Sequence, residues 1–133
     1  MKFDLEKTIS YWLESAEYDL KTAESLFITE RYPYSLFFGH LAIEKLLKAL
    51  VVKDTKEHAP HTHSLPFLAS KISLEIPEYI ERKLATFMEF YFEARYPNEQ
   101  KSFYIKCTKD FTKKNLEDIG EVFRWLKEKL SVY

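Results

Sequence analysis

The segment SLFFGHLAIEKLLKALVV, residues 35–52, is the helix around which the rest of this 133-residue sequence is organised. Its apolar residues return every three or four positions, as one face of a helix requires. These residues are Leu36, Phe37, Ile43, Leu46, Leu47, Leu50 and Val51. Gly39 lies within this apolar stripe and predicts a close helix crossing. His40, Glu44 and Lys48 follow one another at intervals of one turn, so they share a face beside the stripe.

The segments on either side of this helix also have helical spacing. A first helix begins at Leu5 and ends before Arg31-Tyr32-Pro33, where proline favours a turn. After a polar loop over residues 53–63, a third helix is predicted over Leu65–Ile72, with Ser64 as its N-cap. The chain is therefore expected to reverse direction at each of these breaks.

Two further helices are predicted in the second half of the chain. The fourth begins at Pro77 and stops at Arg95-Tyr96-Pro97, and the last runs from about Thr108 to Leu130. The intervening segment up to Cys107 has no clean period and is expected to be extended or irregular. Four long helices and one short one predict an all-α, up-and-down antiparallel bundle that forms a single domain over residues 1–133.

Composition excludes several classes of protein. Hydrophobic residues make up 46% of the chain, which is too apolar for disorder, and two glycines are too few for a many-stranded sheet. The net charge of -1 gives no global attraction for nucleic acid, so any such contact needs a local patch. A lone cysteine, Cys107, excludes an internal disulfide, and no apolar run reaches about 18 residues. We expect a cytoplasmic protein that is neither exported nor embedded in a membrane.

His40, Glu44 and Lys48 allow two interpretations. They form either a polar cluster in a cleft, with His40 as acid, base or base-stacking group, or a packing arrangement. In the second interpretation Glu44 satisfies a half-buried His40 and forms an ordinary helix ion pair with Lys48, worth about 0.2–0.5 kcal/mol. Residue types alone favour packing, because buried polar groups usually need only a partner.

Three histidines in one loop, His58, His61 and His63, suggest a metal site, but their context argues against one. No cysteine lies nearby, and the chain has no Glu followed three residues later by His, as di-iron bundles require. We therefore predict no metal and no cofactor. His63 is expected to organise the start of the third helix.

Arg95 and Tyr96 place a cation beside a stacking surface. Arg95 is suited to holding a phosphate in bidentate fashion and Tyr96 to stacking on a base, while the alternative is that Arg95 caps its own helix. A lysine-rich and aromatic segment follows, which either binds single-stranded RNA or a nucleotide or is simply a solvated face. Its residues are Lys101, Phe103, Tyr104, Lys106, Lys109, Phe111, Lys113 and Lys114.

Four stretches together resemble the HEPN domain (higher eukaryotes and prokaryotes nucleotide-binding) over nearly the whole chain. They are Trp12, Ala16, Asp19-Leu20 and Ala23; the segment Tyr34 to Leu50; Thr62-His63-Ser64-Leu65; and Arg95-Tyr96-Pro97. The resemblance implies a bundle of four or five helices that forms a homodimer. It also implies that the chain binds nucleotide or RNA and acts as the HEPN component of a toxin–antitoxin pair with a minimal nucleotidyltransferase.

Many proteins of this kind are metal-independent ribonucleases with an arginine followed, after four to six residues, by a histidine. After Arg95 those positions hold Gln100, Lys101 and Ser102, and no histidine occurs beyond His63. The usual catalytic partner of the arginine is therefore missing. The sequence favours a nucleotide- or RNA-binding protein with Arg95, Tyr96, His40, Glu44, Lys48 and His63 as its candidate binding residues. The alternatives are a toxin ribonuclease with a variant active site and a pure protein-interaction module.

Overall fold

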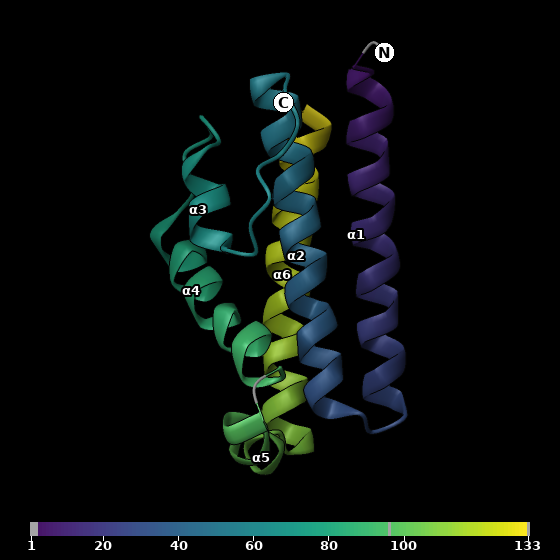
Figure 1. The fold of residues 1–133 in the computed structure, drawn as a ribbon, viewed down its shortest axis with the longest axis vertical. Helices are drawn as coiled ribbons and strands as arrows, with labels where there is room; N and C mark the ends of the chain where they lie inside the picture. The colour runs from purple at the N-terminus through teal and green to yellow at the C-terminus, as the bar shows by residue number, and fades with distance from the viewer. Residues whose placement is uncertain (1–2, 96, 133) are drawn as a thin grey trace.

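The structure, a computed structural model, describes residues 3–95 and 97–132, with side chains described for 3–95 and 101–131. All regular structure in these ranges is helical. The helices are α1 Leu5–Ile28, α2 Tyr32–Thr55, α3 Leu65–Ser70, α4 Glu78–Glu93, α5 Pro97–Lys106 and α6 Lys109–Val132. Four of them are long and pack antiparallel, with α3 beside α4 and α5 across one end of the bundle (Figure 1). The predicted all-α up-and-down bundle is confirmed.

Helix α2 occupies the centre of the bundle. It packs against α1 and α6 along its length and against α3 and α4 on a further side (Figure 1). Its buried residues are Ser35, Leu36, Gly39, His40, Ala42, Ile43, Glu44, Leu46, Leu47, Lys48, Ala49, Leu50, Val51 and Val52. The helix extends beyond the predicted range of 35–52 at both ends, and Pro33 fits its first turn. Polar residues of α2 are thus carried into the core along with its apolar stripe.

Gly39 brings α2 and α6 close together. A Cβ atom built at Gly39 would come within 2.5 Å of Ile119 Cδ1, and Ile119 is completely buried. A side chain at this position would push the two helices apart. The predicted close crossing is confirmed.

The prediction of an extended or irregular segment before Cys107 is wrong, because residues 97–106 form α5. This helix is anchored chiefly by Phe103, which is buried with its ring centroid 6.1 Å from that of Phe90 on α4. Tyr104 and Ile105 beside it are exposed. One inward aromatic residue in a short helix leaves no repeat to detect in the sequence.

The start of α3 is as predicted, although the helix ends at Ser70, two residues short of the predicted Ile72. Ser64 Oγ accepts a hydrogen bond from the Phe67 amide at 3.2 Å, which caps the helix. In the described ranges, no helix has both the length and the apolar character needed to cross a lipid bilayer.

Candidate functional site

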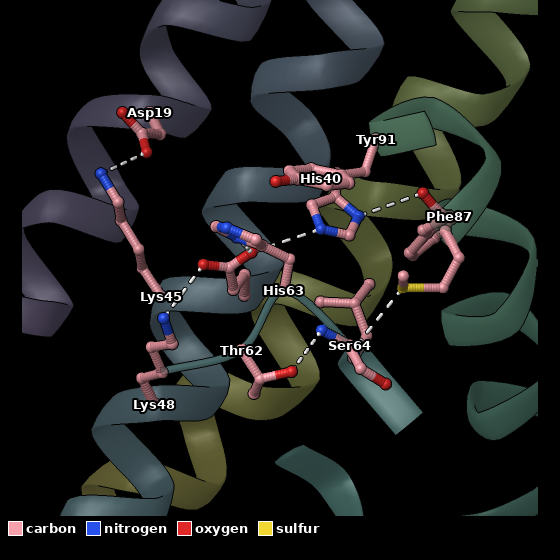
Figure 2. A network of polar contacts seen from close by, with 12 residues as sticks. Asp19, His40, Lys45, Lys48, Thr62, His63, Ser64, Phe87 and Tyr91 are labelled. Atoms are coloured by element: carbon pink, nitrogen blue, oxygen red, sulfur yellow. Dashed lines mark hydrogen bonds and ion pairs between the residues drawn. The ribbon is translucent and has the colours of Figure 1, made fainter. Parts of the chain in front are cut away.

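A buried carboxylate, that of Glu44, is the centre of a polar cluster on α2. Lys48 Nζ donates to Glu44 Oε2 at 3.1 Å, and His63 Nδ1 lies 3.0 Å from Oε1. His40 Nε2 lies 3.4 Å from the same Oε1 atom. Glu44 therefore holds three side chains, two from its own helix and one from the loop before α3 (Figure 2).

His40 is fully buried between α2 and α4. Its Nδ1 lies 3.1 Å from the backbone carbonyl oxygen of Phe87, and because a carbonyl only accepts, Nδ1 carries a proton (Figure 2). Its Nε2 faces the Glu44 carboxylate, which also only accepts, so Nε2 gains a hydrogen bond there only as an imidazolium. The packing interpretation expected a half-buried ring, whereas the structure buries His40 completely.

His63 is the exposed member of the cluster around Glu44. Its side chain is 54% exposed, whereas that of Glu44 is only 4% exposed. The ring of His63 stacks on that of Tyr91, with centroids 4.5 Å apart and planes inclined by 24°. The Ser64 amide donates to Thr62 Oγ1 at 3.1 Å and holds this part of the loop (Figure 2). His63 does adjoin the start of α3, but its contact with Glu44 was not predicted.

Tyr91 joins this cluster to the end of α4. Its ring stacks with that of His63 and also with that of Phe37, whose centroid is 5.8 Å away. Arg95 Cζ lies 4.8 Å from the centroid of the Tyr91 ring, and Arg95 Nη1 donates to the Tyr91 hydroxyl. Arg95 and His63 therefore rest on one aromatic ring. Sequence reasoning missed Tyr91, whose only signal was its position one turn before Arg95.

The environment of Glu44 keeps its carboxylate ionised. Burial acts to raise the pKa of Glu44, but hydrogen bonds from His40 and His63, with the charge and hydrogen bond of Lys48, bring the pKa below its ordinary value. Lys48 is nearly buried and also lies over the Trp12 ring, 5.1 Å from its centroid. The cluster is thus an anion surrounded by cationic and polarised groups.

A second charged pair on α2 faces the opposite direction. Lys45 Nζ lies 2.8 Å from Asp19 Oδ2 on α1, on the side of α2 away from α4 (Figure 2). Asp19 is buried and Lys45 is partly exposed. This pair joins α1 to α2.

The remaining candidate residues are less closely connected. Tyr96, predicted to stack on a base, lies outside the described residues. Within the lysine-rich segment, Lys106 pairs with Glu89 at 3.3 Å and Lys114 with Asp118 at 3.4 Å. Both lysines are therefore partly neutralised, and this segment is a weaker anion-binding surface than its composition suggested.

The described residues contain no converging group of three or more His, Cys, Asp or Glu side chains suited to a metal ion. The loop histidines have separate partners: His58 packs edge-on against the Phe3 ring, and His63 contacts Glu44. Burial, together with Glu93, raises the pKa of Cys107 to about 12 despite the opposing effect of Lys106. Cys107 is thus a neutral thiol near pH 7 and a poor nucleophile.

Comparison with known proteins finds a sequence family that matches this chain and solved structures with the same fold. A family model described as "HEPN domain" matches residues 9–130. The crystal structure of TT1696 from Thermus thermophilus superposes with a TM-score of 0.79 at 20% identity, covering 91% of this chain and 97% of that one. The structure of ST0689, described as an archaeal HEPN homologue, gives 0.71 at 19% identity, covering 92% and 97%. No curated protein matches the sequence. At these identities the two structures establish the fold alone.

Proposed function

Because this chain belongs to the HEPN domain family, we propose that it binds the phosphates of a nucleotide or of RNA at the face formed by Arg95 and His63. One observation carries the proposal: these two side chains, from different elements, lie 4.8 and 4.5 Å from the centroid of the Tyr91 ring. A guanidinium binds phosphate oxygens in pairs, and an imidazole nitrogen supplies a further donor. Tyr96, the next residue after Arg95, supplies the stacking surface for a base.

The buried members of the predicted site act indirectly in this proposal. His40, Glu44 and Lys48 are too deeply buried to contact a ligand themselves. They hold His63, since Glu44 contacts its Nδ1 and is itself held by Lys48. The exposed part of the site is thereby positioned from within the core.

The protein is further proposed to be a cytoplasmic homodimer and the HEPN component of a toxin–antitoxin pair with a minimal nucleotidyltransferase. Family membership supports this pairing. Exposed apolar side chains near the α4–α5 end, namely Phe92, Tyr104 and Ile105, support association with another chain. Co-expression with any minimal nucleotidyltransferase found to be encoded beside the gene, followed by light scattering of the single protein and of the mixture, tests both associations.

Binding to labelled single-stranded RNA, compared between the wild type and Arg95→Ala, tests the ligand. The substitution is expected to weaken binding at least tenfold, because it removes the paired phosphate contact. Arg82→Ala is the matched control: Arg82 lies on α4, which ends two residues before Arg95, and its side chain is 72% exposed and pairs only with Glu78 among its described contacts. Equal affinities of all three proteins for RNA would refute the proposed site. If neither variant changes complex formation with the partner and no RNA is bound, a pure protein-interaction module is the better description.

A metal-independent ribonuclease is a second candidate function, favoured by the contact between Glu44 and His63. An imidazole oriented by a carboxylate is suited to accept the proton of a ribose 2′-hydroxyl, and Arg95 would stabilise the charge developing at phosphorus. Incubation of the purified protein with total RNA and a chelator separates this candidate from simple binding. Cleavage that is lost in both His63→Ala and Arg95→Ala would establish the ribonuclease.

A further inference from the structure

From the Glu44–His63 contact we infer that the site binds a terminal phosphate, with His63 as an imidazolium, so that ligand binding takes up a proton. This inference rests on the proposed function and specifies its ligand. In the described structure His63 Nδ1 is engaged by Glu44 Oε1 at 3.0 Å, and the ring is half exposed. Nε2 is therefore the nitrogen available to a ligand.

The hydrogen-bonding capacity of Nε2 depends on its protonation. Because Nδ1 donates to a carboxylate, a neutral His63 ring has only a lone pair at Nε2. A lone pair cannot bind the oxygens of a phosphate, which are themselves acceptors. The ring becomes a donor to phosphate only when Nε2 also gains a proton, and Glu44 then stabilises the resulting charge.

Charged groups of both signs surround His63. From α2, Glu44 favours a positive ring, whereas Lys48 on the same carboxylate opposes it; His40 faces that carboxylate with its Nε2. Just after the end of α4, Arg95 lies over the Tyr91 ring on which His63 stacks and adds a further cation. A bound phosphate offsets these cations, so proton uptake and phosphate binding favour each other.

The arrangement fits a phosphate monoester better than a diester. A monoester carries three non-bridging oxygens and nearly two negative charges at neutral pH, and so can serve both the Arg95 guanidinium and the His63 imidazolium. An internal diester has two non-bridging oxygens and one charge, which Arg95 alone can satisfy. The expected ligand is thus the phosphorylated end of an RNA or a free nucleoside monophosphate.

The test is calorimetric titration with three probes: a 5′-phosphorylated RNA oligonucleotide, the same RNA with a 5′-hydroxyl, and adenosine 5′-monophosphate. Titrations run between about pH 7 and 8.5, where the monoester is mostly a dianion, so proton uptake reports mainly on the protein. Buffers of different ionisation enthalpy measure that uptake. We expect the 5′-phosphate to tighten RNA binding, and affinity to fall by up to about tenfold per pH unit. The monophosphate arm distinguishes a free nucleotide from an RNA end.

Three variants assign the proton to His63. His63→Gln is expected to abolish proton uptake, whereas His61→Gln, an exposed histidine of the same loop, leaves it unchanged. Glu44→Gln keeps the size of the side chain but removes its charge, so proton uptake at pH 7 should fall in a protein that circular dichroism shows to be folded. A purely structural role for Glu44 would lower affinity without changing proton uptake.

The outcomes separate this inference from the proposed function. RNA binding that depends on Arg95 but shows no proton uptake, no gain from the 5′-phosphate, or unchanged uptake in His63→Gln overturns the inference and leaves the proposed function intact. Absence of binding by all three probes overturns both. If Glu44→Gln does not fold, the comparison of His63→Gln with His61→Gln still decides the question.

Discussion

Helices α2 and α4 each contain a glutamate followed four residues later by a cation, and the two pairs have nearly the same length. Lys48 Nζ lies 3.1 Å from Glu44 Oε2, and Arg82 Nη1 lies 3.3 Å from Glu78 Oε1. Their surroundings differ: the side chains of Glu44 and Lys48 are 4% and 9% exposed, and those of Glu78 and Arg82 are 82% and 72% exposed. One local motif thus occurs in both the core and the surface of the same molecule.

The difference between the two pairs shows that tertiary packing sets the energetic weight of a local motif. Water screens the Glu78–Arg82 pair, and exposed helix pairs of this type contribute about 0.3–0.5 kcal/mol. The Glu44 carboxylate has lost its water and depends on protein partners, among them His40 and His63, for its hydrogen bonds. Removing a partner is therefore costly in α2 and nearly free in α4.

The largest expected effect is that of Glu44→Ala, which leaves Lys48 and the His40 Nε2 edge buried without their anion. Breaking a buried ion pair in this way costs about 3–5 kcal/mol. Glu78→Ala is the matched control and should cost less than about 0.5 kcal/mol. Urea unfolding followed by circular dichroism measures both. Similar losses in the two variants would mean that the burial of Glu44 has no energetic consequence.

A smaller effect is expected at the two glycines, which also share a helical setting but differ in surroundings. Gly39→Ala should destabilise the protein by about 1–3 kcal/mol, because its Cβ would meet the buried Ile119 Cδ1. Gly120→Ala meets only Arg124 Nη1 at 3.4 Å and should be neutral or stabilising by up to about 1 kcal/mol.

Thermal unfolding compares the two glycine variants, with the double variant Gly39→Ala/Ile119→Val as the check on mechanism. Loss of the Cδ1 methyl should recover part of the stability of Gly39→Ala. No recovery would show that contact with Ile119 is not the cause.

The smallest expected effect is a difference between the wild type and Glu44→Gln in how the free energy of unfolding depends on acidic pH. The pKa of Glu44 is lower in the folded protein than its ordinary value. The resulting stabilisation is complete above that ordinary value and is lost as pH falls through the folded pKa. Wild-type unfolding free energy should therefore decline more steeply below about pH 4.5 than that of Glu44→Gln. Urea unfolding at stepped pH values tests this, and parallel curves would contradict the assignment.

Much of the bundle could be predicted because its long helices carry regular apolar spacing. Helix α1 begins at Leu5 as predicted, and the stripe of α2 lies in the core. Ser64 caps α3 because a short polar side chain at a helix start has a purely local partner, the Phe67 amide. Helix α5 could not be predicted in this way, since it depends on burial of Phe103 against Phe90 on another helix.

The candidate site, too, could be predicted only in part from the sequence. Residues 35–52 alone indicated that His40, Glu44 and Lys48 share one face, because helix geometry relates positions four apart. Only the tertiary structure decided that this face is buried, that His63 reaches Glu44 from a loop, and that His63 and Arg95 meet on Tyr91. The physical reason is the distance along the sequence over which each property is determined. Helical periodicity depends on residues a few positions apart, whereas burial and contacts between helices depend on how distant segments pack.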